Sequence, residues 1–125
     1  MSIDVTYRER QPGLFELTLA GRLDTDTYAQ VEATLDGIFA NAVRGIQFDM
    51  RDLTYLSSMG LRVLIKTMKR LRPVRGTVTL THLQPQIHKV IEIASVLPKE
   101  NIFSSVEEAD AYFDAMQSKV LGQDG

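Results

Sequence analysis

The chain has 125 residues, of which 44% are hydrophobic and 24% charged, and its formal net charge at pH 7 is −2. This length supports one ordinary hydrophobic core. The near-neutral charge argues against a nucleic-acid-binding protein, since most such proteins carry an excess of basic residues. The absence of cysteine excludes disulfides and cysteine-ligated metals, and no apolar stretch approaches the roughly 20 residues that cross a bilayer. We therefore expect one soluble, cytoplasmic domain over residues 1–118 and a frayed tail over 119–125. It should have no cofactor, no metal, no membrane insertion and no direct contact with nucleic acid.

The spacing of apolar residues predicts the elements in chain order. Alternation of apolar and polar side chains predicts strands at 3–7, 14–20, 46–50 and 77–81, and a short fifth strand at 102–103. The turn residues at 11–13 should join the first two strands as an antiparallel hairpin. Apolar stripes at helical spacing predict helices at 28–39, 61–71, 85–94 and 106–116, and a loop should fill 51–57.

This order of elements predicts the fold class. It is α/β: a two-layer sandwich in which a mixed sheet of four to five strands has about four helices covering one face. Parallel strands covered on both faces read as continuous apolar runs. Here the strands alternate, with Gln47, Asp49, Thr77 and Thr79 on the second face. We therefore expect that face to be largely open, which excludes a doubly wound nucleotide-binding fold.

Most catalytic motifs are absent from the sequence. It has no Gly-rich phosphate loop, no G-x-S-x-G elbow and no H-E-x-x-H pair. Ser58, His82 and Asp52 could be combined into a hydrolase triad on paper, but nothing in the sequence orients them. His82 and His88 are expected to be surface or half-buried residues, and the protein is not expected to be an enzyme.

Two adjacent serines, Ser57 and Ser58, stand where the second helix begins. One interpretation is capping, since a serine hydroxyl accepts from an orphan amide and contributes about 0.5–2 kcal/mol. Gly60 would then let the helix pack closely on the sheet. The other interpretation is that one serine accepts a phosphate, which a helix N-terminus tolerates. Arg51 and Arg62 could then add charge-assisted contacts.

The second helix and the residues after it are rich in cations. They are either a solvated face or a docking surface for an acidic partner. The cations are Arg62, Lys66, Lys69, Arg70, Arg72 and Arg75.

Two motifs give the sequence a resemblance to a known family. G-R-L-D at 21–24 and D-L-T-Y-L-S-S-M-G-L at 52–61 resemble the G-x-L/I-D and D-L-S-x-x-D/S-S-x-G-L segments of STAS domains of the anti-sigma factor antagonist type. The resemblance covers nearly the whole chain and follows the S-S-x-G-L-R variety of the family. Ser57 stands where many members carry Asp, and Met59 where many carry Ser or Thr.

The resemblance implies a bacterial signalling protein that regulates transcription by partner switching. Its unphosphorylated form would bind a serine-kinase anti-sigma factor and so free a sigma factor. That kinase would phosphorylate the family serine, which falls on Ser58 (Ser57 is the second candidate), and so release the antagonist. A PPM-type serine phosphatase would reverse the step, and the antagonist itself would need no cofactor.

We expect the partner-binding surface to lie where the second and third strands end. Asp24 should either cap the first helix or contact the kinase. The expected residues are Asp24, Thr25, Ser57, Ser58, Met59, Gly60 and Arg62. The resemblance leaves one alternative, a non-phosphorylated STAS docking subunit of a lipid-transport or other membrane-associated complex.

Overall fold

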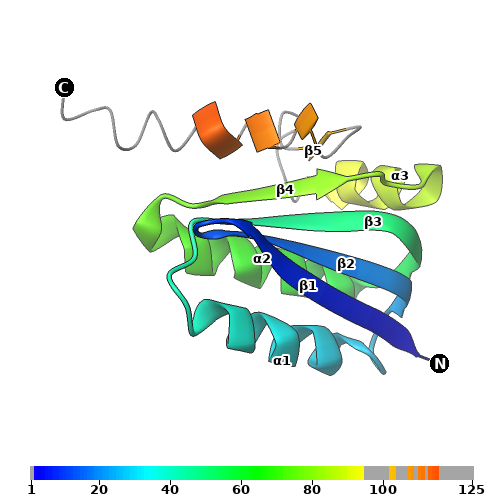
Figure 1. The fold of residues 1–125 in the computed structure, drawn as a ribbon. Helices are drawn as coiled ribbons and strands as arrows, with labels where there is room; N and C mark the ends of the chain where they lie inside the picture. Colours follow the sequence, from blue (N-terminus) through cyan, green and yellow to red (C-terminus); the bar gives the residue numbers. More distant parts are fainter. Residues whose placement is uncertain (1, 95–101, 104–106, 109, 112, 116–125) are drawn as a thin grey trace.

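The structure is a computed structural model that describes residues 2–94, 102–103, 107–108, 110–111 and 113–115. The five strands lie in the sheet in chain order, β1-β2-β3-β4-β5 (Figure 1). β1 and β2 pair antiparallel, whereas the pairs β2–β3, β3–β4 and β4–β5 are parallel. The predicted hairpin, the mixed sheet and the short fifth strand are therefore confirmed. The elements are β1 (Ile3–Gln11), β2 (Leu14–Leu23), α1 (Tyr28–Phe39), β3 (Gly45–Leu56), α2 (Ser58–Leu71), β4 (Thr77–Thr81), α3 (Pro85–Ala94) and β5 (Ile102–Phe103).

Strands β2 and β3 are longer than the sequence predicted. β2 was expected to end at Ala20 and β3 to give way to a loop over 51–57, but the two strands stay paired as far as Leu23 and Leu56. Register shifts after Thr18 and after Gly21 interrupt the ladder. Such irregularities break the period of two and add local twist, so the extended segment reads as a loop in the sequence. The extension brings Leu23 and Leu56 to the same edge of the sheet.

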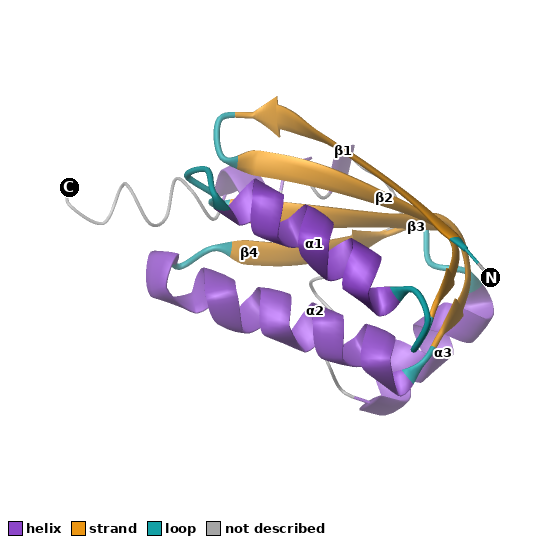
Figure 2. Cartoon of the chain, turned by 90° about the horizontal axis from the view of Figure 1, so that it is seen from below, coloured by secondary structure: helices purple, strands orange, loops and turns teal. Residues whose placement is uncertain are grey.

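Helices α1 and α2 lie side by side on one face of the sheet (Figures 1 and 2). Their apolar stripes pack against the inward side chains of β2, β3 and β4, as the helical and alternating periods predict. α3 adds Ile87 and Ile91 to the same core. Fully buried members of this core include Leu17, Leu19, Val31, Ile38, Ile46, Phe48, Leu64 and Leu80.

The second face is less open than predicted. The described residues of 107–115 are helical and lie on the side of the sheet opposite α1 and α2 (Figure 1). Phe113 is buried, and its ring occupies the space that a side chain at Gly45 would need. Asp110 accepts a hydrogen bond from Gln47 at 2.8 Å and pairs with Arg10 at 2.9 Å. Sheet alternation cannot distinguish a solvated face from a polar face that another helix covers, since both place polar residues at every second position.

The end of α2 coincides with the end of the helix predicted at 61–71. The helix ends at Leu71, a short 3-10 turn spans Arg72–Val74, and Arg75 adopts a left-handed conformation with φ of 55°. In the part of the chain described above, no helix is both long and apolar enough to cross a membrane. The first residue of the helix predicted at 106–116 and the tail predicted at 119–125 lie outside the described residues.

Candidate functional site

The ends of β2 and β3 bring together the two segments that carry the sequence motifs. The backbone N–H of Ser57 donates to the carbonyl oxygen of Leu23 at 3.0 Å. The start of α2 therefore lies directly beside the loop 24–27 that leads into α1. Parallel strands place their carboxyl ends at one edge of a sheet, where binding residues commonly gather. The predicted proximity of the Asp24 loop and the Ser58 segment is confirmed.

The two serines occupy different environments. Ser57 is the N-cap of α2: its backbone is extended, and its Oγ accepts from the N–H of Gly60 at 3.4 Å. It is half-buried. Ser58 is the first helical residue, is exposed, and has no hydrogen-bond partner for its hydroxyl among the described residues. The capping interpretation thus applies to Ser57 and leaves the hydroxyl of Ser58 free in solvent.

Gly60 sets how closely α2 approaches the sheet. A Cβ at this position would lie 2.4 Å from Cδ1 of Leu56 and 2.9 Å from Cγ of Leu23. Both leucines are buried in the main core. The predicted close packing of helix on sheet is therefore confirmed. It places half-buried Met59 and exposed Arg62 on the outer side of the first turns of α2.

Asp24 organises the loop before α1. Its Oδ1 accepts from the N–H of Asp26 at 3.0 Å, and its Oδ2 lies 3.5 Å from Nε of Arg22. The N-cap of α1 is Thr27, so the first of the two alternatives for Asp24, a cap of this helix, is wrong, and contact with a kinase stays a prediction. The carboxylate instead folds the loop one turn earlier, as Asp commonly does in turns. Thr25, at the loop's tip, is exposed.

The charge state of Asp24 is fixed by these contacts. Partial burial alone would raise the pKa of Asp24, but hydrogen bonds from Asp26 and Thr27 and the charge of Arg22 outweigh it, so the pKa is held below its ordinary value of 3.8. The folded protein therefore favours the ionised carboxylate.

Asp24→Asn should lower the melting temperature at pH 7, because Asn keeps an acceptor oxygen but loses the charge that faces Arg22. A carboxylate whose pKa is lowered by folding stabilises the protein above its unfolded pKa, and this contribution is lost as pH falls through the folded value. The difference from wild type should accordingly shrink below about pH 3.8. Thermal melts between pH 7 and pH 3 check this. Asp26→Asn is the control and should melt like wild type, because Asp26 is exposed and its side chain makes no hydrogen bond or ion pair with the described residues.

An exposed aromatic residue that was not among the predicted site residues adjoins this site. Tyr55 is 41% exposed, and the guanidinium of its cross-strand neighbour Arg22 lies 4.1 Å from its ring centroid. Because β3 was expected to have ended, the register that pairs these residues was not predictable. An exposed tyrosine stacked by an arginine is typical of contact surfaces between proteins.

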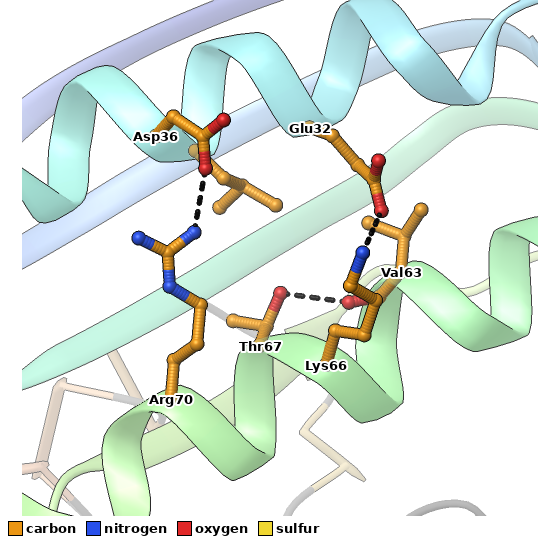
Figure 3. A pocket seen from close by; sticks show the side chains of 7 residues that line it. Glu32, Asp36, Val63, Lys66, Thr67 and Arg70 are labelled. Carbon is orange, nitrogen blue, oxygen red and sulfur yellow. Dashed lines mark hydrogen bonds and ion pairs between the residues drawn. The ribbon is translucent and has the colours of Figure 1, made fainter.

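Some of the cations predicted near the site form ion pairs or hydrogen bonds within the molecule, and others do not. Lys66 pairs with Glu32 at 2.9 Å, and Arg70 pairs with Asp36 at 2.7 Å, so both fasten α2 to α1 across a shallow groove (Figure 3). Arg51 is hydrogen-bonded to His82 at the end of β4. Among the described residues, Arg62 alone of these four has no partner. Of the predicted basic face, Lys66 and Arg70 are therefore paired within the molecule, whereas Arg62, Lys69 and Arg72 are exposed and their side chains have no partner among the described residues.

The structure does not assemble a catalytic triad. Nδ1 of His82 lies 3.4 Å from the carboxylate of Asp49, and its Nε2 lies 3.1 Å from Arg51. Neither Ser58 nor Asp52 contacts His82. Within the described ranges, no cluster of three or more potential metal ligands is found.

The fold and this site define a class of small α/β modules. In this class an exposed serine stands at the start of a helix, next to the loop that follows the neighbouring parallel strand. The chain belongs to the STAS domain family, whose profile matches residues 7–109. The resemblance on which the sequence analysis relied is therefore confirmed.

The chain is similar to several known proteins. It is 34% identical over 101 residues to a Bordetella bronchiseptica protein named as the putative anti-sigma factor antagonist BtrV, covering 81% of this chain and 87% of that one. A structure of an anti-sigma factor antagonist from Mycobacterium paratuberculosis superposes with a TM-score of 0.79 at 17% identity, covering 90% and 94%. The unphosphorylated anti-sigma factor antagonist SpoIIAA superposes with a TM-score of 0.74 at 20% identity, covering 95% and 97%. At these identities the two structures support the fold, and the α/β class with its mixed sheet is confirmed.

Proposed function

We propose that this chain is an anti-sigma factor antagonist that works by partner switching. Its unphosphorylated form binds a serine-kinase anti-sigma factor, and phosphorylation of Ser58 by that kinase ends the binding. The name of the Bordetella relative supports the assignment of the class. The observation that carries the mechanism is the exposed, unbonded hydroxyl of Ser58 at the first residue of α2.

The environments of the two serines favour Ser58 over Ser57 as the phosphate acceptor. A kinase needs a hydroxyl that it can reach, and Ser58 is exposed whereas Ser57 is half-buried. Phosphorylation of Ser57 would also alter the oxygen that accepts from Gly60 and so disturb the cap of α2. Modification of Ser58 leaves this cap in place, and the fold can persist in both states of the switch.

The proposed effect of the phosphate is electrostatic. A phosphoserine adds about 1.5–2 negative charges at pH 7, and the free N–H groups at the start of α2 stabilise such a charge on the protein itself. Arg62 is exposed one turn further along and is the nearest cation of α2 without a partner in the described residues. A partner surface shaped for a neutral serine would meet a desolvated dianion, which weakens binding strongly.

The proposed partner surface combines the loop 24–27 with the start of α2. Asp24 and Thr25 come from the loop, and Met59 and Arg62 from the first turns of the helix; Gly60 sets their spacing. Tyr55 extends the surface at the end of β3, where its exposed ring offers the kind of aromatic anchor that dominates many interfaces.

In this proposal, other proteins supply the catalysis and the nucleotide for the switch. The chain performs no catalysis and needs no cofactor, since the kinase brings the nucleotide and a PPM-type serine phosphatase removes the phosphate. We place the protein in the cytoplasm as a single STAS domain over residues 1–118, without membrane insertion or direct contact with nucleic acid.

The proposal is tested by phosphorylation with the cognate kinase, captured from the native cell with Ser58→Ala as bait. Incubation of wild type with this kinase and Mg-ATP should add about 80 Da to the intact mass, and peptide mapping should place the group on Ser58. Ser58→Ala should remain unmodified, whereas the matched variant Ser57→Ala should still be modified. Modification of Ser58→Ala at the wild-type rate would refute Ser58 as the acceptor.

A further inference from the structure

Strand β1 forms one edge of the sheet and pairs only with β2 in the part of the chain that the structure describes (Figure 2). An edge strand presents backbone N–H and C=O groups that can pair with another strand. The stretch Ile3–Glu9 pairs with β2 without interruption, and the register shifts only between Glu9 and Gln11. A regular strand segment is thus available along this edge.

This segment is self-complementary when it is paired antiparallel about its middle residue, Thr6. Asp4 of one copy then lies opposite Arg8 of the other, and Val5 lies opposite Tyr7. Opposite charges and pairs of aromatic with β-branched residues are among the cross-strand neighbours that stabilise antiparallel strands. Tyr7 is 51% exposed, and such a pairing would cover its ring.

The geometry of antiparallel ladders limits which registers are possible. Outward-pointing backbone groups alternate along a strand, so only a register that joins residues of the same parity aligns donors with acceptors. Pairing about Thr6 meets this condition, and so does pairing about Tyr7. The second register would place Asp4 opposite Arg10, whose side chain is only 24% exposed and which lies in the irregular part of β1. Arg8 pairs with Glu16 in its own copy, but its side chain is 70% exposed and lies in the regular stretch. Pairing about Thr6 uses the regular stretch alone.

We propose that β1 is a homodimer interface, in which two copies pair their β1 edges antiparallel about Thr6 into one continuous sheet. The contact is isologous, so each Asp4–Arg8 and Val5–Tyr7 pair occurs twice. Residues opposite each other in a ladder share a face, so the α1 and α2 layers of both copies lie on the same side. The charged residues of β1 disfavour pairing with strands whose charges do not match. A second copy of β1 in this register has matching charges. This inference does not depend on phosphorylation of Ser58.

Charge reversal at the two complementary positions tests the inference. Asp4→Arg places two arginines opposite each other at both symmetric contacts, and Arg8→Asp does the same with two aspartates. A mixture of the two variants restores an opposite pair at each contact and should form a heterodimer. Asp4→Arg is the cleaner variant, because Asp4 is exposed and its side chain makes no hydrogen bond or ion pair with other described residues. Arg8→Asp also removes an ion pair with Glu16 at 3.1 Å, so its fold is checked by circular dichroism.

The matched control is Asp52→Arg, which makes the same substitution elsewhere in the sheet. Asp52 is exposed, and its side chain makes no hydrogen bond or ion pair within the described part of the chain. It lies on β3, which β2 separates from the β1 edge. The change in net charge is therefore the same as in Asp4→Arg, but no charge changes on the proposed interface strand.

Sedimentation equilibrium on protein freed of any N-terminal tag gives the dissociation constants. Wild type should dimerise with rising concentration, Asp4→Arg should dimerise at least about tenfold more weakly, and the equal mixture should recover. Asp52→Arg should behave like wild type. Amides of residues 4–8 should gain protection from hydrogen exchange as concentration rises. A wild type that stays monomeric up to about 0.5 mM, or an Asp4→Arg dimer as tight as that of Asp52→Arg, would overturn the inference.

Discussion

Replacing Ser58 by Asp should weaken binding to the partner kinase by about a thousandfold, which corresponds to about 4 kcal/mol. The new carboxylate would stand at an exposed position at the start of α2, beside the loop that carries Asp24 and Thr25. Burying this charge against a partner surface that lacks a matching cation costs its desolvation free energy, and no attraction across the interface offsets that cost. Isothermal titration of the purified kinase with each variant measures the effect.

Two variants separate the effect of the charge from the loss of the hydroxyl. Ser58→Ala removes the hydroxyl without adding charge and should bind the kinase within a few-fold of wild type. Ser58→Asn matches Asp in shape and should resemble Ser58→Ala. Equal affinity of Ser58→Asp and Ser58→Ala would mean that a charge at this position does not control binding, and the partner switch as proposed here would be wrong. The melting temperature of each variant shows whether the fold is retained.

Ser58→Ala and Ser58→Asp also address the alternative function that the sequence left open. A docking subunit of a membrane-associated complex would use the STAS fold as a structural element and would not need a serine that changes state. In that case the proteins captured from the native cell with Ser58→Ala and with Ser58→Asp should be the same. A kinase captured by Ser58→Ala and lost with Ser58→Asp separates the partner switch from this alternative.

The alternating and helical periods predicted most of the fold because the main core depends on them. Ile46, Phe48 and Met50 alternate as a half-buried strand should, and all three are buried. The prediction was wrong where the backbone departs from its period. The register shifts between β2 and β3 interrupt the alternation, so the second half of β3 was predicted as a loop. No residue type marks a bulge unambiguously. Secondary structure was thus predictable where it is regular.

The covered part of the second face could not be predicted for a different reason. Gln47 and Thr79 are buried although they are polar, and the side-chain amide of Gln47 donates to Asp110, which is far away in the sequence. Long-range pairing of this kind leaves no local signal. The neutralisation of Lys66 and Arg70 by α1 was missed for the same reason. The site itself was more predictable, since its residues lie close together in two short motifs at the ends of adjacent strands.

Gly60→Ala should destabilise the protein by about 1–3 kcal/mol, although alanine is the better helix former. A Cβ at this position would lie 2.4 Å from Cδ1 of Leu56, 2.9 Å from Cγ of Leu23 and 3.1 Å from the carbonyl oxygen of Leu23. That carbonyl also accepts from the N–H of Ser57, so it cannot move without loosening the junction of β2 and α2. The steric cost should therefore exceed the roughly 0.5–1 kcal/mol that alanine gains in a helix over glycine.

Gly37 provides a matched control in the same protein. It also lies within a helix, α1, but a Cβ there would meet no atom within 4 Å. Gly37→Ala should stabilise the protein by about 0.5–1 kcal/mol, so the two identical substitutions are expected to have opposite signs. Urea unfolding followed by circular dichroism gives both free energies. If Gly60→Ala were as stable as Gly37→Ala, α2 would not be held against Leu23 and Leu56 as described. The close approach that presents Ser58 beside the Asp24 loop would then lose its structural basis.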